Sequence, residues 1–196
     1  MILQAIASVV GRLRRDQRGG VLIEAAFTIP IAVMLLLAGF EIARLTLIHQ
    51  KMDRVATAMA DLVSQSEDIT VAQLNDMFNA AQHIMEPFDL SGKGVVIVSS
   101  IGTPISNPTT IYWQRNGAGS VSASSQIGTE GNAPTLPTGF VVRDGEGLIV
   151  AEVYYNYAPL LFWDIVGPNQ LYHRAFFRPR LDTDGFSSMI SVSSAI

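Results

Sequence analysis

Residues 21–40 read VLIEAAFTIPIAVMLLLAGF, and this stretch decides the fold. As a helix, its 20 residues would be about 30 Å long, which is the thickness of the hydrocarbon core of a bilayer. Glu24 is its only charged residue. A surface helix of a soluble protein carries a polar face, and this stretch has none. The sequence therefore predicts one transmembrane helix near the N-terminus.

Pro30 lies inside this predicted span. Proline has no backbone N–H, so the carbonyl of Ala26 loses its helical hydrogen bond. Membrane helices tolerate this where neighbouring groups satisfy the carbonyl. We expect either a kink or a locally melted turn at Pro30.

The residues before the span are basic, whereas the rest of the chain is acidic. The first 19 residues carry a net charge of +3, from Arg12, Arg14, Arg15 and Arg18 against Asp16. The whole chain has a formal net charge of −4, so the remainder carries −7. By the positive-inside rule, the N-terminus should stay cytoplasmic and the body should be exported. An acidic body argues against binding of nucleic acid, which requires basic surface.

Three kinds of leader could precede such a span. A cleavable signal peptide has a shorter apolar core followed directly by small residues, and the small residues here come only at Ala56–Ala60. A twin-arginine signal needs apolar residues after its arginine pair, but Asp16 and Gln17 follow Arg15. A prepilin leader is cut on the cytoplasmic side, before the apolar run, and the sequence fits this kind best.

Glu24 is the residue that most needs an explanation. A carboxylate at the centre of a bilayer costs about 2.5–3.5 kcal/mol, and such residues usually pair with another charge. Cleavage after Gly19 would make Glu24 the fifth residue of the mature chain and would give Gly20 a new ammonium group. The ammonium group would lie one turn from Glu24, and it would be equally available to Glu24 of a neighbouring subunit. Alternatively, Glu24 lies close enough to the membrane interface to reach water.

The stretch DQRGGVLIEAAFTIPIAVMLLLAGFEIARL resembles the TadE/TadG-like pseudopilins of tight-adherence pilus systems, which belong among the type IV prepilins. The matching positions are Arg18, Gly19, Glu24, Ala25, Pro30, Glu41 and Arg44. The resemblance covers residues 14–45. It implies cleavage by a prepilin peptidase between Gly19 and Gly20, although the doubled glycine leaves a cut after Gly20 open. It also implies other pilins and the assembly machinery as partners, with Glu24 serving peptidase recognition and assembly.

Beyond the span, the patterns predict an α+β domain. Apolar residues continue at three- and four-residue steps to Leu62, which predicts an unbroken helix over 20–64. Thr70 and Gln73 are spaced as a capping box for a second helix ending before Pro87. We expect strands over 94–102, 109–114, 140–143, 147–157 and 170–178, and a surface loop with few anchors over 115–139. About four of these strands should form an antiparallel sheet against the distal part of the helix.

These patterns divide the chain into a basic leader (1–19), a transmembrane and amphipathic helix (20–64) and an export-side α+β domain (65–196). In the aromatic stretch Tyr154, Tyr155, Tyr157, Phe162 and Trp163, alternate side chains should pack on the helix while the others face outward.

No catalytic or metal-binding pattern is present in the sequence. The chain has no cysteine, and His49, His83 and His173 are scattered without metal-ligand spacing. Asp182 to Gly185 is a fragment of a calcium-loop pattern that lacks the downstream glutamate, so we interpret it as a turn. We therefore expect a protein that is not an enzyme and needs no cofactor.

Two functions remain open at this stage. The first is a minor pilin or pseudopilin in the inner membrane, processed by a prepilin peptidase. The second is a membrane-anchored, export-side binding module whose leader is never cut. The N-terminus of the mature protein distinguishes them.

Overall fold

The computed structural model describes residues 18–66, 68–103, 108–160, 167–180 and 191–193. The chain divides into two units, residues 1–43 and residues 44–196. Helix α2 (Arg18–Ser64) contains the boundary between them. The predicted unbroken helix is confirmed, and it begins two residues earlier than expected. It continues through Pro30 without interruption, so the alternative of a melted turn is wrong.

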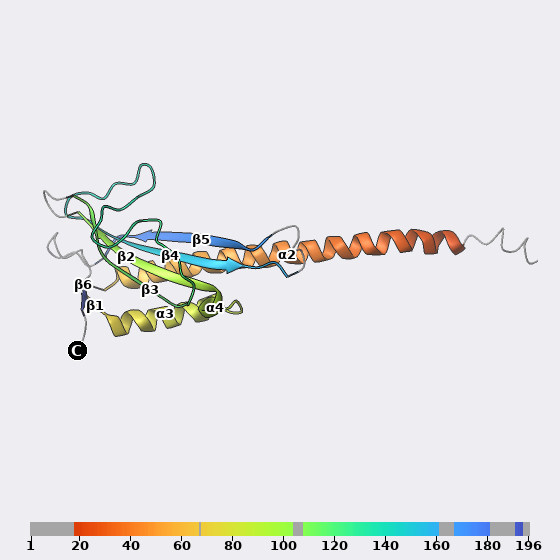
Figure 1. Ribbon diagram of the computed structural model, residues 1–196, viewed down its shortest axis with the longest axis horizontal. Helices are drawn as coiled ribbons and strands as arrows, with labels where there is room; N and C mark the ends of the chain where they lie inside the picture. The colour runs from red at the N-terminus through yellow and green to blue at the C-terminus, as the bar shows by residue number, and fades with distance from the viewer. Residues whose placement is uncertain (1–17, 67, 104–107, 161–166, 181–190, 194–196) are drawn as a thin grey trace, which may run out of the picture. The chain divides into compact units, whose positions relative to one another are not determined.

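The second unit has a four-stranded antiparallel sheet with the strand order β3-β2-β4-β5 (Figure 1). Its strands are β2 (Gly94–Gly102), β3 (Thr110–Gly117), β4 (Gly147–Tyr157) and β5 (Asn169–Phe177). β2 and β4 have the predicted bounds, because runs rich in β-branched and aromatic residues, each beginning at a glycine, are a strong strand signal. The predicted α+β class is therefore confirmed.

One face of the sheet is covered by helices. The buried side chains of α2 include Ile48, Met52, Val55 and Met59, and they pack with Val98 and other residues from β2 and β4 in one core cluster. α3 (Val71–Met85) packs into the same cluster through Phe78 and three other buried residues. The apolar stripe of the distal part of α2 therefore faces the sheet, as its periodicity predicted.

The predicted capping box at the start of α3 is confirmed. The Thr70 N–H donates to Gln73 Oε1 at 2.9 Å, and the Gln73 N–H donates to Thr70 Oγ1 at 3.2 Å. Each side chain thus satisfies a backbone group that the helix leaves unpaired.

The opposite face of the sheet is covered by the segment 118–146. Ile127 is fully buried and packs with Ile101, Ile111 and Leu148, while Val121 packs near Tyr154. Residues 118–139 form the predicted surface loop, with Ile127 as a main anchor, whereas 115–117 belong to β3. Although the composition of this loop favours turns, apolar residues such as Val121 and Ile127 are enough to cover this face of the sheet.

Near its start, segment 118–146 contains Gly119, and the reason for glycine at this position is visible only in the structure. A Cβ at Gly119 would lie 1.9 Å from the carbonyl oxygen of Gly94. Only glycine allows the chain to cross the start of β2 this closely.

Three further differences separate the expected elements from the observed ones. Residues 140–143 form no strand, although the turn at Asp144 and Gly145 is present, with Gly145 at φ +79°. A short helix α4 (Leu90–Lys93) precedes β2. β1 (Asp68–Thr70) and β6 (Ser191–Ser193) form a separate parallel pair. Three-residue strands and a one-turn helix are too short to produce a detectable period.

Candidate membrane anchor and assembly site

The N-terminal part of α2, residues 19–43, has the size and surface of a membrane anchor. The helix is long and apolar enough to span a bilayer, and its most apolar 18-residue window has no buried residue. Twelve large apolar side chains are exposed along it: Val21, Leu22, Ile23, Phe27, Ile29, Ile31, Val33, Met34, Leu35, Leu36, Phe40 and Ile42. Each gains about 1.5–3 kcal/mol on leaving water, so in water this surface would be strongly unfavourable.

Gly19 and Gly20 lie in the first turn of this helix. A Cβ at either position would meet nothing within 4 Å. Packing within the chain therefore does not require glycine at these positions. Each glycine weakens a helix by about 1 kcal/mol relative to alanine, so two in succession weaken this first turn.

Glu24 follows one turn after Gly20 and is exposed on α2. Its neighbours on the same helical face include Val21 and Phe27, so the carboxylate lies beside exposed apolar side chains. Arg18 begins α2, and its side chain is not described. Arg12, Arg14 and Arg15 lie outside the described residues, as do Phe162, Trp163 and the segment Asp182 to Gly185.

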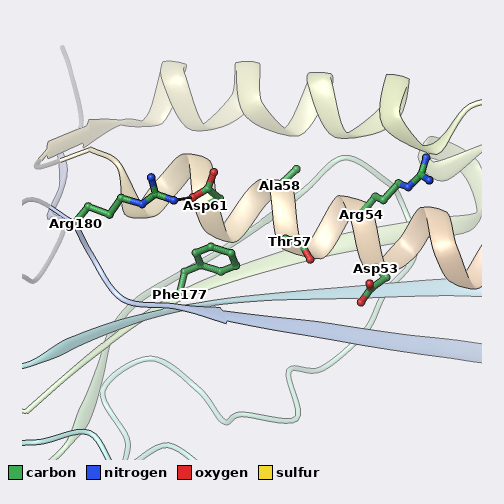
Figure 2. Close-up of a pocket in the computed structure, with 7 residues that line it drawn as sticks. All are labelled: Asp53, Arg54, Thr57, Ala58, Asp61, Phe177 and Arg180. Carbon is green, nitrogen blue, oxygen red and sulfur yellow. Dashed lines mark hydrogen bonds and ion pairs between the residues drawn. The ribbon is translucent and has the colours of Figure 1, made fainter.

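A groove runs along the second unit between α2 and the end of β5 (Figure 2). Its volume is about 470 Å³, and it is lined by Asp53, Arg54, Thr57, Ala58, Asp61, Phe177 and Arg180. Asp53, Thr57 and Asp61 are spaced four residues apart, which places them on one face of the helix. The groove therefore presents side chains of both charges around one aromatic ring.

Arg180 forms one end of this groove. Its guanidinium lies 2.6 Å from Asp61 Oδ1, and its backbone N–H donates to the carbonyl of Ser64 at 3.0 Å. The second bond satisfies one of the unpaired carbonyls at the end of α2. The ion pair is partly exposed, so it contributes at most about 1 kcal/mol.

Two histidines that are 124 residues apart in sequence meet beside this groove. His49 Nδ1 lies 2.8 Å from His173 Nε2, and His173 Nδ1 lies 3.7 Å from Asp53 Oδ1. The fold thus brings together two histidines that are scattered in the sequence, whereas His83 lies apart, exposed beside Glu86. No spacing rule in the sequence could have paired them, because one lies on a helix and the other on a strand.

Glu152 is a second group that the sequence interpretation missed. It lies on β4, is fully buried, and faces the segment 118–146. Its carboxylate accepts hydrogen bonds from the Ser125 hydroxyl, the Gln126 N–H at 3.0 Å, and the hydroxyls of Tyr154 and Tyr172 at 3.2 and 2.8 Å. Burial, followed by the proximity of Glu152, raises the pKa of the Tyr154 phenol, so this hydroxyl stays protonated as a donor. A single carboxylate in an otherwise apolar strand was the available signal.

The aromatic side chains of β4 alternate between the two faces of the sheet as predicted, but those on the outer face are not exposed. Tyr155 and Tyr157 pack on the helix face of the sheet, and Tyr154 points to the other face. Tyr154 is only 3% exposed, because segment 118–146 covers it. The expectation that it faces outward is therefore wrong.

In the part of the chain that the structure describes, no group of three or more histidine, aspartate or glutamate side chains is placed to hold a metal ion. The His49–His173 pair offers two ring nitrogens, and Asp53 lies behind His173 on the ring nitrogen that faces away from His49. The functional features of the described residues are thus an apolar helix with the exposed carboxylate of Glu24 near its start, and a domain surface with a groove and a histidine pair. Comparison with protein-family models, with curated proteins and with solved structures finds no match to this chain.

Proposed function

We propose that this chain is a minor pilin or pseudopilin of a tight-adherence pilus system, anchored in the inner membrane and processed by a prepilin peptidase. The observation that carries the proposal is Glu24, a single carboxylate near the start of an exposed apolar helix, directly after Gly19, Gly20 and a basic leader. The protein would act in priming or assembly of the fibre rather than as an enzyme.

The two glycines support processing at this point. They are not needed for packing, and they weaken the first helical turn. A peptidase must bind its substrate in an extended form, so a weak first turn lowers the cost of unwinding the helix around the Gly19–Gly20 bond. The expected product begins at Gly20, with an ammonium group one turn from Glu24.

Glu24 then has a cationic partner in a setting where charges attract strongly. In hydrocarbon the attraction is little screened, so an ammonium group of the same or a neighbouring subunit offsets the cost of burying the carboxylate. This pairing would favour subunits in a defined register. The partners implied are the prepilin peptidase, other pilins or pseudopilins, the assembly machinery and the membrane itself.

The basic leader supports an orientation with the N-terminus in the cytoplasm and the domain exported. A reporter that is active only outside the cytoplasm, fused after Ile196, should therefore give signal. Activity of a cytoplasm-only reporter at the same position would contradict this topology.

Glu24→Gln and Glu24→Ala test the assembly role directly. Glu24→Gln keeps the size of the side chain and removes its charge, and Glu24→Ala should also enter the bilayer more easily. The proposal predicts normal or improved membrane insertion together with reduced co-purification of partner subunits and reduced pilus assembly. Val21→Ala on the same helical face is the matched control and should leave both readouts unchanged. Full assembly by both Glu24 variants would show that Glu24 does not act in assembly.

The groove along α2 gives some support to the second function, an uncleaved, export-side binding module. The groove is built in the domain and requires no processing of the leader. Under this alternative the mature chain would begin at Met1, and the Glu24 variants would keep all their partners.

A further inference from the structure

The contact between His49 and His173 joins two elements that are otherwise held by apolar packing. His49 lies on α2, and His173 lies on β5, which is an edge strand of the sheet. The ring nitrogens are 2.8 Å apart and the ring centroids 5.1 Å apart. A nitrogen–nitrogen contact of this length is a hydrogen bond, so one ring must donate and the other must accept.

This requirement limits the number of protons that the pair can hold. A neutral imidazole has one donor and one acceptor nitrogen, whereas an imidazolium has two donors and no acceptor. The contact can therefore form when both rings are neutral or when one is charged. It cannot form when both are charged, because two donors would face each other and two positive charges would repel.

We propose that His49 and His173 form an acid-sensitive latch that holds helix α2 to edge strand β5 while at least one ring is neutral, and releases it when both are protonated.

The groups around the pair favour this behaviour. On α2, Asp53 lies one turn beyond His49, and its Oδ1 lies 3.7 Å from His173 Nδ1. On β4, Val153 lies opposite His173 and carries no charge. Tyr155, on the same face of β4, has a pKa raised mainly by burial, so it stays neutral.

The nearby cations are engaged elsewhere. Arg174 follows His173 on β5, and its guanidinium lies over the rings of Tyr172 and Phe176. On α2, Arg44 donates to the carbonyl of Ala158 and Lys51 donates to the carbonyl of Ile84.

The closed contact disfavours a proton on His49. Burial lowers the pKa of His49 from its ordinary value of 6.5, and the charge of His173 lowers it further. A group whose pKa is lowered by folding contributes stability that is complete above its unfolded value and is lost as the pH falls toward its folded value. The latch should thus hold at neutral pH and weaken as the pH falls below about 6.5.

Opening the latch would change the surface next to it. Asp53 lines the groove of Figure 2, as does Phe177, which lies on the same strand as His173. Separation of β5 from α2 at His173 therefore widens the groove at the Asp53 end, while the ion pair between Arg180 and Asp61 still closes the other end.

Hydrogen–deuterium exchange of the full chain in detergent micelles between pH 7.5 and 5.0, corrected for the intrinsic pH dependence of exchange, tests this latch. As the pH falls, the protection factors of peptides from β5 should decrease by up to about tenfold per pH unit. This decrease should occur between the pKa of the pair in the open state and its pKa in the closed state. Peptides from β2 should stay protected. His49→Gln removes the titrating group and keeps an amide that can donate and accept, so its β5 protection should not depend on pH. His83→Gln, at an exposed histidine, should behave like the wild type.

The imidazole nitrogen resonances of the wild type give a second readout that does not depend on how a variant folds. His49 and His173 should titrate as a coupled pair in two separated steps, and the loss of β5 protection should follow the second step. Independent titration of the two rings, or equal pH dependence of β5 protection in the wild type and His49→Gln, would overturn the proposal.

Discussion

Helix α2 contains two regions with the same local structure and opposite surroundings. Between residues 19 and 43, large apolar side chains such as Leu22 and Phe27 are more than two-thirds exposed. Between residues 44 and 64, side chains such as Ile48 and Met59 are fully buried against the sheet. Helix formation therefore does not distinguish the two regions. Their surroundings do, because the second is buried in a protein core, whereas the first is exposed and is long and apolar enough to span a bilayer.

The same contrast applies to the carboxylates. Glu24 lies exposed on an apolar helix, whereas Glu152 is fully buried and accepts four hydrogen bonds. Protein groups satisfy Glu152 within its own domain. For Glu24, the proposed function supplies a partner from outside this domain, namely the ammonium group that cleavage would create at Gly20 of the same or a neighbouring subunit.

The largest expected effect compares two methionines on α2. Met52→Ala removes a fully buried side chain and should lower the free energy of unfolding of the domain by about 2–5 kcal/mol. Met34→Ala, at a side chain that is 60% exposed, should change it by less than about 0.5 kcal/mol. Denaturant titration of the full chain in micelles, followed by tryptophan fluorescence, measures both. Equal losses would show that the two regions of α2 do not differ as described.

Glu152→Ala should have the next largest effect and should lower the free energy of unfolding of the domain by about 3 kcal/mol. The substitution removes the acceptor of the Ser125 and Tyr172 hydroxyls and one of the two acceptors of the Gln126 N–H, so it loosens segment 118–146 on the sheet. Limited proteolysis should then cut within this segment first. Glu130→Ala breaks an exposed ion pair with Arg115 and an exposed hydrogen bond from the Gln114 N–H, and it should cost about 1 kcal/mol. A similar cost for both variants would contradict the role assigned to Glu152.

Thr70→Ala has the smallest expected effect, a loss of about 1 kcal/mol of domain stability. It removes the side chain that caps α3 and accepts the Gln73 N–H. Thr70→Ser keeps the hydroxyl and is the matched control, with a smaller loss. Thermal unfolding followed by circular dichroism compares the three chains, and an unchanged midpoint for Thr70→Ala would contradict the capping box.

The sequence predicted correctly the elements that contain a long periodic segment. α2, α3, β2 and β4 each repeat one pattern over nine or more residues, so local chemistry determines them. Residues 140–143 were predicted as a strand from four residues, too few to distinguish a strand from an extended loop. The composition of residues 115–139 predicts a surface loop with few anchors but not which residues anchor it, and these are the buried Ile127 and the hydrogen bonds to Glu152.

The candidate sites also differ in how far the sequence could reveal them. Gly19, Gly20 and Glu24 could be singled out because their meaning lies in their spacing along the chain. The pairing of His49 with His173 depends on which strand lies beside α2, and this depends on the whole sheet order β3-β2-β4-β5. Contacts of that kind cannot be obtained from periodicity.

Under the proposed function, the apolar helix is processed before it takes part in assembly, and the N-terminus of the mature chain shows whether this cut occurs. Protein extracted from membranes of cells with an active prepilin peptidase should give an intact mass and an N-terminal sequence beginning at Gly20, shorter by the 19 residues of the leader. Gly19→Leu should block the cut and restore the full-length mass. A mature wild-type chain that still begins at Met1 in such cells would contradict the account.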